Sequence, residues 1–214
     1  MANSLIRRPL WMVSLCVFAT LLTARSQESA AEPTFVFDTG NPPWRGERIE
    51  LPPGFAPDLG WKGVEQIRFA PGMFTAGEED FFSYVLVFLL SKEAKTDKPT
   101  LERELLTYYR GLSNAVMGGK GQSVETEGFT IALEVIADAK NAPTSAKDVT
   151  AFTGTLNWVE PFATQKEQTL NLEIFVWKHG DQPVVFSSVS PADPGQETPW
   201  KNLRAIATKF LFEP

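Results

Sequence analysis

Apolar residues fill both alternating sets of positions from Phe81 to Leu90, and Ser83 is the one exception. Because successive side chains of a strand point to opposite faces, this pattern predicts a strand that is buried on both faces, in the middle of a covered sheet. A helix is the weaker alternative, because the run is short and rich in aromatic and β-branched residues.

Five further segments have the pattern of a strand. Four of them alternate apolar and polar residues with a period of two, which predicts one buried face each, and the fifth is a short apolar run. These segments are 65–69, 129–135, 150–159, 170–176 and 184–189. Gly180 and Asp181 lie between the last two segments and predict a hairpin turn there.

Two segments repeat apolar residues at intervals of three and four, which is the pattern of an amphipathic helix. The first spans 100–117, with Thr100 as its expected N-cap and two glycines, 118–119, directly after its end. The second spans 199–210, with Thr198 as its expected N-cap.

The predicted order is therefore β-β-α-β-β-β-β-α, which indicates an α+β domain. We expect a single antiparallel sheet of about six strands with a helix on each face, a three-layer sandwich, because the strand at 81–90 needs cover on both sides. This element order resembles that of the PsbP-like extrinsic proteins of photosynthetic membranes. The resemblance lies in element order alone, so it implies a fold and no function.

The N-terminal residues have the three-part pattern of a secretory signal peptide. Arg7 and Arg8 precede an apolar run at 10–22, and small residues follow it. We expect residues 1–26 to be removed, which places the mature chain in the periplasm or outside the cell without a membrane span. An uncleaved anchor is the alternative, although a run of about thirteen residues is shorter than the roughly twenty that span a bilayer.

The rest of the chain divides into two parts. Residues 27–60 contain six prolines and no sustained period, which predicts a Pro-rich irregular lead-in with at most one short strand near 34–37. Trp44 and Phe55 are expected to pin this lead-in to the body of the protein. Residues 61–214 are expected to form the single α+β domain.

Charge and cysteine content exclude several classes of function. The formal net charge is −6, and an acidic protein is repelled by nucleic acids and anionic membranes. The one cysteine, Cys16, falls within the predicted signal peptide. The mature chain can therefore form neither a disulfide bond nor a catalytic thiolate.

No segment carries a recognisable catalytic or metal-binding motif, and we expect no cofactor. His179 is the only histidine and falls in the predicted hairpin turn, which disfavours a zinc site with its three or four protein ligands. The chain lacks the Gly-x-Ser-x-Gly sequence of a hydrolase nucleophile. Gly118–Gly121 follows a helix, whereas a phosphate loop precedes one. Carboxylates cluster at 78–80 and at Glu125 and Glu127, in connections where charged residues are normally solvated.

Two strand faces are candidate ligand-binding surfaces. Phe175 and Trp177 share a face with Glu173, and aromatic rings beside polar groups can stack on a sugar or a small amphiphile. The interpretation that we favour is that the second helix covers both rings as part of the core. The other candidate is the face of the strand at 65–69 that bears Gln66 and Arg68.

The sequence thus predicts an exported, non-catalytic binding or accessory protein, whose partner is an unknown protein or small ligand. One alternative is a carboxylate-dependent hydrolase of polysaccharide, which needs two carboxylates facing one bond in a cleft. Another is a carrier of a lipid or hydrophobic small molecule, which needs an interior cavity.

Overall fold

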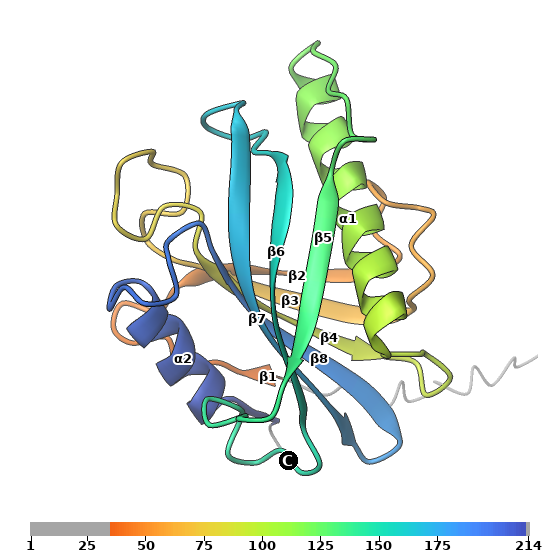
Figure 1. The fold of residues 1–214 in the computed structure, drawn as a ribbon, viewed down its shortest axis with the longest axis vertical. Helices are drawn as coiled ribbons and strands as arrows, with labels where there is room; N and C mark the ends of the chain where they lie inside the picture. Colours follow the sequence, from red (N-terminus) through yellow and green to blue (C-terminus); the bar gives the residue numbers. More distant parts are fainter. Residues whose placement is uncertain (1–34, 213–214) are drawn as a thin grey trace, which may run out of the picture. The chain divides into compact units, whose positions relative to one another are not determined.

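The computed structural model describes residues 35–212. They form a seven-stranded antiparallel sheet, two helices and a separate two-stranded sheet (Figure 1). The predicted α+β fold is confirmed, with seven strands in the main sheet where about six were expected. The predicted signal peptide, 1–26, lies outside the described residues.

The main sheet has the strand order β2-β3-β4-β8-β7-β6-β5, and all neighbouring strands are antiparallel. Its strands are β2 (Arg45–Leu51), β3 (Gly63–Phe69), β4 (Tyr84–Leu90), β5 (Thr130–Ile136), β6 (Thr150–Val159), β7 (Glu167–His179) and β8 (Gln182–Ser190). The small sheet pairs β1 (Phe35–Val36) with β9 (Leu211–Phe212). β8 is the last strand of the main sheet along the chain, and it lies between β4 and β7. It therefore joins the half formed by β2, β3 and β4 to the half formed by β5, β6 and β7.

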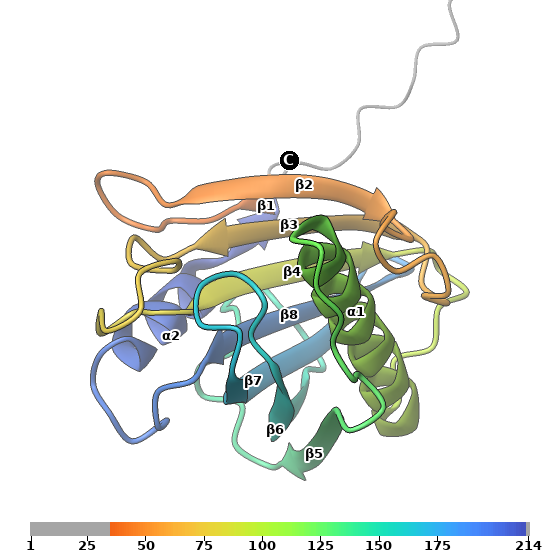
Figure 2. The ribbon, with the colours of Figure 1, turned by 90° about the horizontal axis from the view of Figure 1, so that it is seen from above.

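The two helices cover opposite faces of the main sheet, as the doubly apolar strand required (Figures 1 and 2). Every residue of β4 is buried. Leu86 and Phe88 belong to the apolar layer under α1 (Lys98–Gly119), whereas Val85 and Val87 belong to the layer under α2 (Trp200–Lys209).

The helix starts differ from the predicted ones. Asp97, and not Thr100, is the N-cap of α1: its Oδ1 accepts a hydrogen bond from the Thr100 backbone N–H at 3.0 Å. This cap places Pro99 in the first turn, where its missing N–H leaves no bond unmade. Thr198 does not cap α2 either, because Pro199 occupies the N-cap and no side chain bonds to the helix start.

The Pro-rich lead-in supplies β2, a strand of seven residues that the sequence pattern did not predict. Four of these residues are charged and only Ile49 and Leu51 are large and apolar, so no apolar alternation marks the strand. Charged side chains are common on strands at the edge of a sheet, where they oppose unwanted pairing. The short strand expected near 34–37 is present as β1.

The lead-in also packs on the body of the protein through Phe55, whose ring meets that of Tyr108 edge-on with centroids 5.0 Å apart.

At the opposite sheet edge, Glu102 of α1 accepts a hydrogen bond from the Leu133 backbone N–H of β5 at 2.8 Å. Within residues 35–212, no helix is both long and apolar enough to cross a membrane.

Candidate functional site

The predicted stacking residues Phe175 and Trp177 lie in the apolar layer between the main sheet and α2. Their side chains are only 2% and 5% exposed. Trp177 packs edge-on against Phe210, with ring centroids 6.0 Å apart, and Phe175 packs against Phe186 at 6.5 Å. Neither ring presents a free face to solvent, so a ligand would reach them only if α2 moved.

Glu173 forms an ion pair at the rim of this layer. Arg204 of α2 donates hydrogen bonds to Glu173 Oε1 from Nη2 at 2.5 Å and from Nε at 3.0 Å. The guanidinium also lies 5.2 Å from the Trp200 ring centroid. A hollow of about 390 Å³ borders this pair and Phe175, but the two charges neutralise each other and hold α2 to β7.

Gln66 and Arg68 lie on the face of β3 that is turned toward the α2 side. Gln66 is buried and Arg68 half-buried. Arg68 Nη1 donates to the Ile67 carbonyl oxygen at 3.0 Å, and its Nη2 donates to Gln66 Oε1 at 3.4 Å. Its Cζ lies 4.9 Å from the ring centroid of Phe37, a distance at which cation–π attraction operates.

Two adjoining hollows at the start of β2 share Pro43, Trp44 and Gly46 as walls, and we call them together the Trp44 groove. The aromatic hollow, of about 450 Å³, is further lined by Pro42, Arg45, Glu47, Phe69, Ala70, Pro71 and Phe74. The arginine hollow, of about 460 Å³, is further lined by Phe35, Val36, Phe37, Thr39 and Arg68.

The segment before β2 fixes the position of Trp44. The Trp44 backbone N–H donates a hydrogen bond to Thr39 Oγ1 at 2.9 Å, which closes the loop that leads into the strand. The sequence predicted Trp44 only as a pin for the lead-in. Aromatic residues set among prolines, with no period to assign them to a buried face, are the sequence signal for this groove that the lead-in itself carries.

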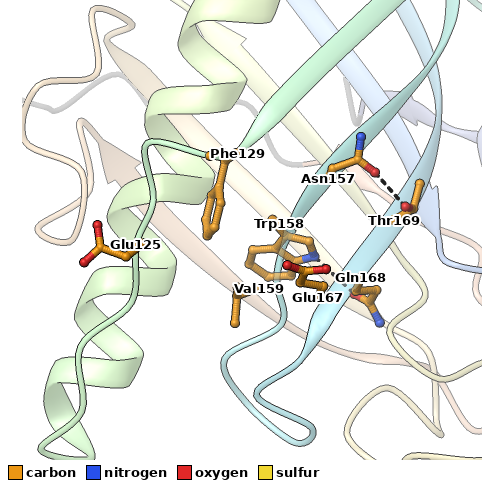
Figure 3. A pocket seen from close by; sticks show the side chains of 9 residues that line it. Glu125, Phe129, Asn157, Trp158, Val159, Glu167, Gln168 and Thr169 are labelled. Carbon is orange, nitrogen blue, oxygen red and sulfur yellow. Dashed lines mark hydrogen bonds between the residues drawn. The ribbon is translucent and has the colours of Figure 1, made fainter.

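A further hollow, of about 420 Å³, contains two carboxylates, those of Glu125 and Glu167 (Figure 3). Phe129 and Trp158 form its apolar wall, and both carboxylate side chains are exposed. In Figure 3 the Phe129 ring lies between the two, and Glu125 is turned away from Glu167. A glycosidase needs both carboxylates directed at one bond, so this arrangement is unlike an acid–base pair.

Glu65 is a fully buried carboxyl group in the layer under α1. Its Oε1 accepts a hydrogen bond from the Tyr108 hydroxyl at 2.8 Å, and its Oε2 has no partner among the described residues. Burial raises the pKa of Glu65 to about 7, against the opposing effect of the Tyr108 hydrogen bond and with a small addition from Glu47. Because Glu65 has no exposed surface, it can offer no proton to a substrate.

The tyrosines beside Glu65 complete a buried polar cluster. The hydroxyls of Tyr84 and Tyr109 are hydrogen-bonded to each other. Burial raises the pKa of Tyr84, Tyr108 and Tyr109, so all three stay protonated and can donate hydrogen bonds. The cluster stabilises the contact between α1 and the sheet.

The single histidine and the acidic residues form no metal site in the part of the chain that the structure describes. His179 ends β7, and its ring stacks on Phe212 with centroids 4.0 Å apart. Among residues 35–212, no three histidine, cysteine, aspartate or glutamate side chains come together as a metal would need.

Comparison with known proteins identifies no family. No protein-family model matches the chain, and no curated protein matches it at a significant level. Among solved structures, the chain is similar to LpqN of Mycobacterium tuberculosis, a protein described as involved in cell envelope biogenesis. The two are 10% identical, the match covers 88% of each chain, and the TM-score is 0.31. Similarity at this level supports no statement about function.

We predict that Trp177→Ala lowers the free energy of unfolding by about 3–5 kcal/mol, because removal of a buried aromatic side chain leaves a cavity. For a chain of this length, thermal unfolding should then show a melting temperature about 10 °C lower. Val135→Ala is the matched control, because Val135 is 63% exposed on β5, and its effect should stay within about 0.5 kcal/mol. An unchanged melting temperature for Trp177→Ala would show that the ring is not part of the core.

We also predict a stability change with pH that depends on Glu65. The pKa of Glu65 is about 7 in the folded chain, against a usual value of 4.5, so the folded state binds this proton more tightly than the unfolded state. The resulting stabilisation is complete below pH 4.5 and is lost as the pH rises through 7, by about 3 kcal/mol in all.

Glu65→Gln isolates this effect, because glutamine has the shape of the protonated acid and does not titrate. Urea unfolding of both chains should show the original protein losing about 3 kcal/mol relative to Glu65→Gln between pH 4.5 and pH 8. A difference between the two proteins that stays constant over this range would mean that folding does not raise the pKa of Glu65.

Proposed function

We propose that the chain is an exported, non-catalytic binding protein and that its ligand-binding site is the Trp44 groove. The observation that carries this proposal is the exposure of Trp44. The other tryptophans of the described residues are all buried, and these are Trp61, Trp158, Trp177 and Trp200. Trp44 alone among them is half-buried, and its side chain forms a wall common to two hollows.

The composition of the groove supports binding over catalysis. Tryptophan, phenylalanine and proline side chains give a rigid apolar surface with little rotamer entropy to lose when a ligand binds. Each hollow has the volume of an ordinary small-molecule site. The groove also contains Arg68, which the sequence analysis selected as a candidate ligand-binding residue. It contains Trp44 as well, which the same analysis expected to attach the lead-in to the body of the protein.

The alternative functions have less support. The carboxylates of Glu125 and Glu167 share a hollow but do not face each other, which disfavours a polysaccharide hydrolase. The apolar layers under α1 and α2 are filled by tightly packed aromatic and aliphatic side chains, which disfavours a carrier with an interior cavity.

The neutral dye N-phenylnaphthylamine, whose fluorescence rises in apolar sites, tests this proposal. We expect saturable binding to the full chain and a loss of affinity of about tenfold or more in Trp44→Ala, because stacking on an indole contributes of the order of 1.4 kcal/mol. Val135→Ala should bind as the original chain does, and the melting temperature of each variant shows whether it is folded under the conditions of the titration. Equal affinity in Trp44→Ala would refute the placement of the site.

A further inference from the structure

We infer that the Trp44 groove selects ligands in which an anionic group adjoins a planar apolar body, and that Arg68 binds the anionic group. The inference rests on the proposed function, since it assigns a ligand class to the same groove. Its basis is a half-buried cation that stands in an aromatic hollow and has no acidic partner among the described residues.

Arg68 has hydrogen-bonding capacity that the described residues leave unused. A guanidinium carries five N–H donors, and within residues 35–212 Arg68 makes two hydrogen bonds, to the Ile67 carbonyl and to the Gln66 amide oxygen. Neither acceptor is charged. No carboxylate of the described residues forms an ion pair with it.

Among residues 35–212, no acidic side chain lines the arginine hollow. Asp38 lies between two walls of the hollow along the chain, and its Oδ2 already accepts a hydrogen bond from Lys209 Nζ at 2.7 Å, in an ion pair. Glu47 follows Gly46 on β2 and lines the aromatic hollow instead. Arg68 is therefore a positive charge without an acidic partner among the described residues, on a protein whose net charge is −6, and charge complementarity favours an anion there.

The Arg68 side chain passes close to Gly46, where a residue with a Cβ atom would not fit. The two residues are register partners across β2 and β3. A Cβ atom at Gly46 would collide with the Ile67 carbonyl oxygen, with Arg68 Nη1 and with Arg68 Cδ. Glycine is depleted in strands, so its presence here is accounted for by the close passage of the arginine over the strand.

The walls of the arginine hollow indicate which group should adjoin the anion in the ligand. Phe37 packs against the guanidinium, and the half-buried Trp44 is another wall of the same hollow. An anion that reaches Arg68 therefore lies next to aromatic faces, which favours a planar apolar group attached to it. The charges that line the aromatic hollow do not favour an anion in the same way, because its Arg45 and Glu47 carry opposite charges.

Two dyes that differ by one sulfonate group test the inference: neutral N-phenylnaphthylamine and anionic anilinonaphthalene sulfonate. On the full chain we expect the anionic dye to bind about tenfold more tightly, which corresponds to one charge-assisted contact of roughly 1.4 kcal/mol. Arg68→Met should bring the ratio of the two affinities close to one. Arg68→Lys should retain part of the preference for the anionic dye, because the charge remains and the fork of donors is lost.

Melting temperatures show whether each variant is folded. If both dyes bind the original chain equally, or if Arg68→Met weakens them equally, Arg68 has only a structural role against Phe37 and the inference fails. If neither dye depends on Trp44, the proposed function itself fails.

Discussion

Burial of both faces of β4 is the constraint on which the rest of the fold depends. One sheet face cannot be left open when Leu86 and Phe88 point one way and Val85 and Val87 the other, because either set would expose a large apolar area to water. Each face therefore requires a helix with its own apolar stripe. β8 shares this environment beside β4, and the strands farther out can then be progressively more polar.

Those parts of the fold that this constraint governs could be predicted from sequence, and the others could not. Burial on one face produces a period of two or of 3.6, which marks β3, β6, β7 and both helices. β2 leaves no such mark, because an edge strand selects charge as much as burial. The start of α1 was misplaced for a related reason: Asp97 and Thr100 are both competent caps, and the choice depends on where Pro99 enters the first turn.

The candidate site, like the fold, could be predicted from the sequence only in part. Gln66 and Arg68 could be selected because polar residues on a strand beside a central one need an explanation. Whether Phe175 and Trp177 are covered depends on α2, which follows them by more than twenty residues in the chain and packs on them only in three dimensions. The approach of Arg204 to Glu173 and of Phe37 to Arg68 likewise depends on tertiary structure, so no local pattern records it.

β3 carries two ionisable residues that lack a full set of partners among the described residues. The charge of each is removed or compensated in a different way. Glu65 and Arg68 are three positions apart on a strand, so their side chains point to opposite faces and cannot neutralise each other. Glu65 can lose its charge by binding a proton, because burial raises its pKa to about 7. Burial lowers the pKa of Arg68, but a guanidinium keeps its proton throughout the pH range of folded proteins. Since no carboxylate among residues 35–212 forms an ion pair with Arg68, solvent or a bound anion is left to compensate its charge within this part of the chain. A proton on the α1 side and an anion on the α2 side would thus stabilise the same strand, and through it the edge strand β2 that forms the wall of the groove.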